Sequence, residues 1–164
     1  MNAGGIFRPG MRGYFIPFGA GVALVVSAFL PWVVVDGVVR KGIPDGPGLW
    51  TAGLGAFSAV LATLSLVTRK NSRHPILVLG LAALGIVTLA WRVMPRLAGE
   101  QALVMSQAQA IVNGSSAGAA PAALVGAGLY LGLVAAAVLV GFGFTIVVKR
   151  ASTPYVLSNP DDDV

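Results

Sequence analysis

Few side chains in this sequence have the chemistry for catalysis or metal binding. Its 164 residues include no cysteine and a single histidine, His74. Because thiolates are missing and no carboxylate lies beside that histidine in the sequence, the residues predict neither a metal site nor a haem site. The patterns of serine hydrolases, zinc peptidases and nucleotide-binding loops do not occur in a suitable context. We therefore expect no catalytic residue, no metal, no cofactor and no enzyme activity.

Charged residues are rare and lie mostly outside the apolar stretches of the chain. They make up 10% of the residues, whereas soluble domains carry about 25%. An ionisable side chain deep inside a membrane span would mark a transport path or a catalytic site, and the uncharged stretches contain none. Asp36 lies nearest to one of them. We interpret it as a solvated loop residue, with a weak surface pair to Arg40 as the alternative.

Four apolar stretches are expected to form transmembrane helices, at about 13–35, 49–68, 75–94 and 121–148. A helix needs roughly 20 apolar residues to cross the ~30 Å hydrocarbon core of a bilayer. The third stretch reaches this length only if Arg92 and Arg96 extend their guanidinium groups to the lipid headgroups. The predicted fold class is therefore all-α: a polytopic membrane protein whose domain 13–148 is a bundle of four transmembrane helices.

The segment before the fourth stretch is prone to form a helix but is half polar. It contains Glu100, Gln101, Gln107 and Gln109, which would be costly to place in lipid. We expect an amphipathic helix at about 98–112, lying on the outer membrane surface or on a neighbouring helix. The run 113–118 has the composition of a turn, and Pro121 suits the first turn of the helix that follows.

The basic residues predict how the helices are oriented. Cytoplasmic segments of membrane proteins are enriched in lysine and arginine. In a four-span topology, seven of the 11 basic residues fall on one side: Arg8, Arg12, Arg69, Lys70, Arg73, Lys149 and Arg150. We therefore predict that segment 1–12 and the tail 149–164 are both cytoplasmic (N-in/C-in). The net charge of +5 is explained by this topology, and no nucleic-acid partner is expected.

The three tryptophans fall at the ends of the predicted spans. Trp32 ends the first, Trp50 begins the second and Trp91 ends the third, so all three would lie at the outer interface. An indole ring is favoured there because its body is apolar and its N–H can remain hydrated. We expect these residues to be interfacial anchors.

Small residues recur at spacings of four in three of the predicted helices. This spacing puts them on one helix face, where small side chains let two backbones approach closely in lipid. The predicted helix-packing or interface residues are Gly19, Ala23, Ser27, Gly55, Ala59, Gly128, Gly132 and Ala136. Packing inside the bundle and contact with a partner both remain open for these faces.

The sequence resembles the small four-helix membrane proteins of actinobacteria, including the tryptophan-operon-associated type. The resemblance rests on Leu30-Pro31-Trp32 at the end of the first predicted helix and on the short basic turn after the second. It implies a four-helix bundle and no particular activity.

These observations lead to two functional expectations. The first is a non-catalytic accessory or structural subunit of a larger membrane protein complex in the bacterial plasma (inner) membrane, with the lipid bilayer and larger subunits as partners. The second is a small homo-oligomeric channel or transporter, formed by self-association. Its path could be lined by hydroxyl side chains, namely Ser27, Ser58, Thr63, Ser65 and Thr88.

Overall fold

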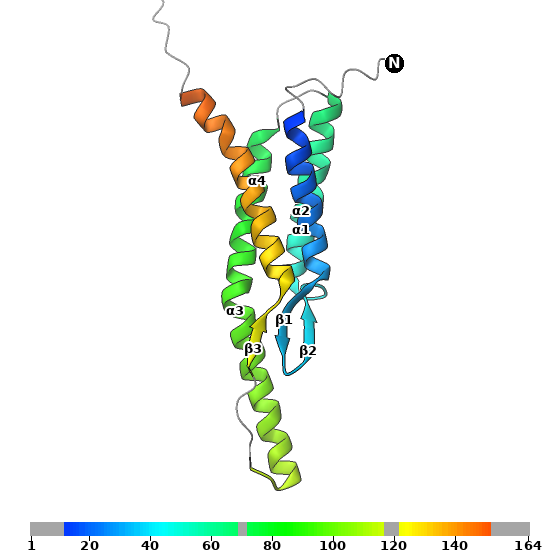
Figure 1. Ribbon diagram of the computed structural model, residues 1–164, viewed down its shortest axis with the longest axis vertical. Helices are drawn as coiled ribbons and strands as arrows, with labels where there is room; N and C mark the ends of the chain where they lie inside the picture. Colours follow the sequence, from blue (N-terminus) through cyan, green and yellow to red (C-terminus); the bar gives the residue numbers. More distant parts are fainter. Residues whose placement is uncertain (1–11, 69–71, 117–121, 152–164) are drawn as a thin grey trace, which may run out of the picture.

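The computed structural model describes residues 12–68, 72–116 and 122–151. Within these ranges the chain is mostly helical: four α-helices lie side by side, and a small sheet lies at one end of the bundle (Figure 1). The helices are α1 (Phe15–Phe29, after a 3-10 turn at Arg12–Tyr14), α2 (Gly46–Thr68), α3 (Arg73–Asn113) and α4 (Ala127–Ala151). By length and composition α2, α3 and α4 are each able to cross a membrane, whereas α1 is shorter.

The four helices form a ring in which each packs against two others. α1 contacts α2 and α4, and α3 contacts the same two helices from the opposite side. The start of α1 and the end of α4 lie at one end of the bundle, and the sheet lies at the other (Figure 1). Segments 1–11 and 152–164, which include most of the two predicted cytoplasmic segments, lie outside the described residues.

α1 is shorter than the predicted span 13–35 because the chain becomes a strand at Pro31. A proline disfavours the helical conformation of the residue before it, and Leu30 has extended angles of φ −80° and ψ 164°. Strand β1 (Pro31–Val35) follows, and it is rich in valine, a residue that favours strands.

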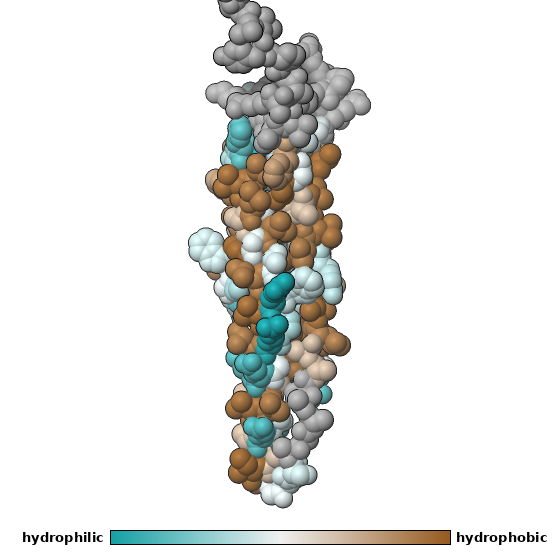
Figure 2. All heavy atoms as spheres, turned by 90° about the vertical axis from the view of Figure 1, so that its left-hand side faces the viewer, coloured by the Kyte–Doolittle hydropathy of each residue, from teal (hydrophilic) through white to brown (hydrophobic). Residues whose placement is uncertain are grey.

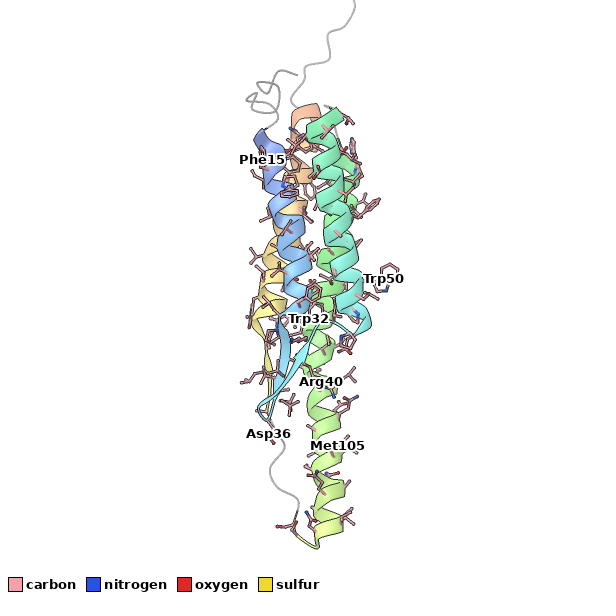
Figure 3. The ribbon with its side chains drawn as sticks, turned by 90° about the vertical axis from the view of Figure 1, so that its right-hand side faces the viewer. Phe15, Trp32, Asp36, Arg40, Trp50 and Met105 are labelled. Atoms are coloured by element: carbon pink, nitrogen blue, oxygen red, sulfur yellow. The ribbon has the colours of Figure 1, made fainter. Side chains whose placement is uncertain are left out.

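β1 and β2 (Val38–Lys41) form an antiparallel hairpin around Asp36 and Gly37. Both turn residues have positive φ, 49° and 77°. A two-residue turn with this geometry matches the twist of the flanking strands and prefers the sequence Asp-Gly. Asp36 is exposed at the hairpin tip (Figure 3).

A third strand, β3 (Ala123–Val125), pairs with the other edge of β1 and gives the order β2-β1-β3. It occupies the beginning of the predicted span 121–148, so α4 starts only at Ala127. Pro121, expected in the first helical turn, lies outside the described residues. The sheet is the main departure from the all-α expectation.

α3 joins the two segments that we predicted as separate helices, 75–94 and 98–112. It is a single helix of 41 residues with Pro95 inside it. Proline has no N–H, so one helical hydrogen bond to the Trp91 carbonyl is missing. The helix continues because its next turn packs on the sheet, where Ala98 is buried in a cluster with Val33 and Val35. At 1.5 Å per residue α3 is roughly 60 Å long, and its second half projects beyond the bundle (Figure 1).

Glycines allow close contacts between helices, among them one between α1 and α2 and one between α3 and α4. A Cβ atom built on Gly21 of α1 would lie 2.7 Å from the carbonyl oxygen of Gly55 on α2. One built on Gly80 of α3 would lie 2.9 Å from the backbone nitrogen of Val140 on α4. Because backbone atoms cannot move aside locally, these contacts require glycine, and they set the separation of both helix pairs.

Candidate functional site

Trp32 lies at the point where α1, the sheet and α4 meet. Its side chain is fully buried, and its indole Nε1–H donates a hydrogen bond of 2.8 Å to the carbonyl of Ser27. The pairing register of β1 with β2 shifts between Pro31 and Val33, so Trp32 occupies a bulge, a feature that often redirects a side chain. A Cβ atom on Gly42 or Gly128 would lie within 2.7 Å of the indole ring. These glycines leave the space that the ring fills.

A cavity of about 660 Å³ opens beside this junction, between the start of α2, the middle of α3 and the hairpin. We call it the α2–α3 groove. It is lined by Val33, Arg40, Asp45, Gly46, Pro47, Trp50, Ile86, Leu89, Ala90, Val93, Met94, Leu97, Ala98 and Gln101. Most of these residues are apolar, and the α3 residues among them run from Ile86 to Gln101, roughly 22 Å along the helix.

The polar residues gather at one end of the α2–α3 groove. Arg40 lies opposite Val33 in the hairpin, and directly opposed residues share one face of a sheet. This face is turned toward α3, where Gln101 lines the same cavity (Figure 3). Asp45, just before α2, is the carboxylate in the lining. In the described part of the chain, Arg40 and Asp45 form no ion pair with each other.

A second, more polar cavity of about 920 Å³ continues from this end, between the hairpin and the projecting half of α3. Arg40, Ala98 and Gln101 belong to both cavities. The second cavity adds two further carboxylates, those of Asp36 and Glu100. The two cavities together are therefore lined by one guanidinium and three carboxylates, and a third cavity of about 500 Å³ beside Arg40 and Asp45 adds the side chain of Lys41.

The projecting half of α3 carries exposed apolar side chains. Val104 and Met105 are exposed, and the side chains of Ile111 and Val112 are 81% and 85% exposed. Together with Ala108 they lie on one side of the helix, at spacings of three, four and seven residues. We call these five residues the α3 strip. Farther up α3, Arg92, Arg96 and Glu100 are exposed at spacings of four, and Figure 2 shows a hydrophilic band on this side of the molecule.

The small residues predicted as packing positions occupy different environments. Gly55 and Ala59 of α2 face Gly21, which the sequence analysis did not single out. Gly128 lies against the Ser27 carbonyl and Trp32. Positions Ser27, Gly132 and Ala136 are buried, Ala23 is half-buried, and Gly19 is exposed with open space where a Cβ would be.

The three tryptophans also differ in environment. Trp50 is 68% exposed and points away from the bundle, and Trp91 is exposed on α3. Trp32 lies at the same end of the bundle as Trp50 but has no accessible surface (Figure 3). Its packing inside the chain explains its position without any contact with lipid headgroups.

Most of the hydroxyl side chains that were suggested as a pore lining are buried inside the helix bundle of one chain. Ser27, Ser58 and Ser65 are buried, and Ser27 and Ser65 donate to carbonyls of their own helices. Thr63 and Thr88 also donate to carbonyls four residues earlier. Thr63 is exposed and Thr88 half-buried, so of the five hydroxyl side chains only these two have an appreciable part outside the bundle of one chain.

Sequence reasoning missed the groove and most of the glycine contacts. Arg40 was considered only as a partner of Asp36, and Gln101 only as part of an amphipathic segment. The hairpin that presents Arg40 did have a signal, Asp36-Gly37 between two valine-rich runs. Within the described ranges, no three histidine, aspartate or glutamate side chains come together as metal ligands would.

The chain matches no protein-family model, no curated protein and no solved structure. The fold defines a class of protein, a helical bundle with three helices able to span a membrane, and its function must be argued from its own surfaces.

Proposed function

We propose that this chain is a four-span protein of the bacterial plasma membrane and a non-catalytic accessory or structural subunit of a larger membrane protein complex. The α3 strip carries the proposal. If α3 begins at one membrane surface, the ~30 Å hydrocarbon core takes up only about half of its length. The α3 strip then lies in water, where exposed apolar side chains in a row are typical of a protein interface.

The four-span topology is supported by the arrangement of the helices. α1 and its preceding 3-10 turn are together about as long as the hydrocarbon core is thick. Trp50 and Trp91, which prefer the membrane interface, are both exposed, and the exposed Arg92 lies beside Trp91. Since α1 starts and α4 ends at the same end of the bundle, the N-in/C-in orientation places the sheet and the α3 strip outside the cytoplasm.

The topology can be tested by fusing reporter proteins to one segment proposed to be cytoplasmic and to one proposed to lie outside the cytoplasm. We expect alkaline phosphatase fused after Val164 to be inactive and a fluorescent protein fused there to be bright, because the excess of basic residues keeps that end inside. The same phosphatase inserted after Asn113, in the loop between α3 and α4, should be active. An active phosphatase after Val164 would overturn the orientation.

The α3 strip can be tested by replacing Ile111 and Val112 together with aspartate. Because the strip would be buried against a larger subunit, we expect the double variant to insert normally but to lose a stoichiometric complex on native gels in mild detergent. Gln107→Asp is the matched control, since it adds a charge to an exposed polar position of the same helix. It should retain the complex.

Two results would contradict the subunit proposal. One is a wild-type protein that migrates as a monomer from mild detergent, and the other is a complex that the double variant leaves intact. A complex that contains only copies of this chain would favour the homo-oligomeric channel or transporter instead.

A further inference from the structure

The α2–α3 groove has the size and polarity pattern of a lipid site. Its volume of about 660 Å³ falls within the ~300–1,000 Å³ common for small-molecule sites. Its apolar part on α3, from Ile86 to Leu97, is roughly 16 Å long. With Trp91 and Arg92 at the outer membrane interface as proposed above, the part from Ile86 to Trp91 lies in the outer leaflet and the part beyond it lies at the depth of the headgroups. The groove can therefore hold the part of an acyl chain nearest its headgroup, if the chain spans a membrane as proposed above.

The polar end of the groove lies where the headgroup of such a lipid would be. Arg40 and Gln101 are next to the apolar wall, and Trp50, a residue suited to the membrane interface, lines the same cavity. A guanidinium pairs well with phosphate because its N–H groups match two phosphate oxygens. Arg40 is thus suited to bind the phosphate of a phospholipid.

The carboxylates decide which headgroup fits. Asp45 lines the groove itself, and Asp36 and Glu100 line the adjoining polar cavity. Lys41 lines neither of these two cavities, but it lines a third with Arg40 and Asp45, so the five charged side chains together carry one net negative charge. A headgroup with a further negative charge would be repelled by these three carboxylates, whereas an ammonium group would be attracted to them. A primary ammonium also has N–H groups to donate to the Asp45 carboxylate.

We propose that the α2–α3 groove binds a zwitterionic phospholipid with a primary ammonium, such as phosphatidylethanolamine. The part of one acyl chain nearest the headgroup lies along α3, starting at the level of Ile86. Its phosphate pairs with Arg40 and its ammonium with Asp45. This inference rests on the proposed location in a membrane. The bound lipid fills the seam between α2 and α3 that the protein's own side chains leave open.

The proposal is tested with protein purified in mild detergent, stripped of lipid and titrated with defined lipids in native mass spectrometry. The lipids are phosphatidylethanolamine, phosphatidylcholine and phosphatidylglycerol with identical acyl chains. We expect phosphatidylethanolamine to bind about tenfold more tightly than the other two, equivalent to about 1.4 kcal/mol. Arg40→Gln should weaken all three, because it removes the phosphate contact. Asp45→Asn should remove only the preference for phosphatidylethanolamine.

Arg96→Gln is the matched control, since it removes the same charge from an exposed position of α3 that lines neither the groove nor the two cavities beside it. It should bind all three lipids as the wild type does. Equal binding of the three lipids, a preference for phosphatidylglycerol, no binding, or equal effects of Arg40→Gln and Arg96→Gln would each overturn the inference. Extraction of native membranes with carbonate separates the two proposals: a protein released by carbonate refutes the membrane location, whereas a retained protein without the lipid preference refutes only the groove assignment.

Discussion

Gly21→Ala is expected to destabilise the bundle by about 1–3 kcal/mol, the usual range for an overpacked core. The new Cβ would lie 2.7 Å from the Gly55 carbonyl oxygen and 2.8 Å from the Ala59 backbone nitrogen. Both atoms belong to the backbone of α2, so α1 and α2 would have to move apart along their length. In lipid no hydrophobic gain offsets the lost contacts, because acyl chains are as apolar as the helix surface. Thermal unfolding in detergent, followed by circular dichroism, measures the effect.

Gly19→Ala is the control for this prediction. Gly19 lies on the same helix, two residues away, with nothing within 4 Å of its Cβ position. Because alanine is the better helix former by up to about 1 kcal/mol, this variant should be as stable as the wild type or more stable. If the two variants unfold at the same temperature, the close contact between α1 and α2 does not exist as described.

Trp32→Ala is expected to cause a larger loss, about 3–5 kcal/mol, as is typical when a buried aromatic side chain is removed. It would leave a cavity between α1, the sheet and α4, and it would remove the donor to the Ser27 carbonyl. Low yield or loss of a cooperative unfolding transition would be consistent with this. Trp32→Phe keeps most of the volume but lacks the N–H, so it should be intermediate.

Trp50→Ala provides the comparison that separates packing from interfacial anchoring. Trp50 is largely exposed, so its removal should change the unfolding temperature only slightly. Three equal interfacial anchors would instead give similar effects at Trp32 and Trp50. Equal effects would therefore contradict the buried junction, and a large difference would support it.

Much of the helical architecture is visible in the sequence because it depends on local composition. The apolar stretches at 49–68 and 75–94 lie within α2 and α3, and most of 121–148 lies within α4. Such stretches are helical wherever water is excluded, since the backbone must satisfy its own hydrogen bonds. The same reasoning gave a wrong prediction at 31–35, which was expected to be helical. The valines there continue the apolar run of α1, but they form a strand after Pro31.

The predicted break before 98–112 shows the limit of a local rule. The break was predicted from the polar residues of 98–112, which would be costly in lipid, and Pro95 is a further local reason for a helix to end. The structure continues α3 through them because Ala98 packs against the sheet, and that sheet is completed by β3, which comes later in the sequence. A local sequence pattern cannot predict this contact, because the contacting residues are far apart in the chain.

The sequence by itself determined the helical class and the sparse, peripheral charges, because both depend on composition and on residues adjacent in the chain. The turn at Asp36-Gly37 also had a local signal, but it was not predicted. The tertiary structure alone decided that Trp32 is buried and Trp50 exposed, that Gly21 rather than Gly19 contacts α2, and that Arg40 and Gln101 line one groove. These features join segments far apart in the sequence. They follow from how the helices and the sheet pack together, and that packing depends on the shapes of all the surfaces at once.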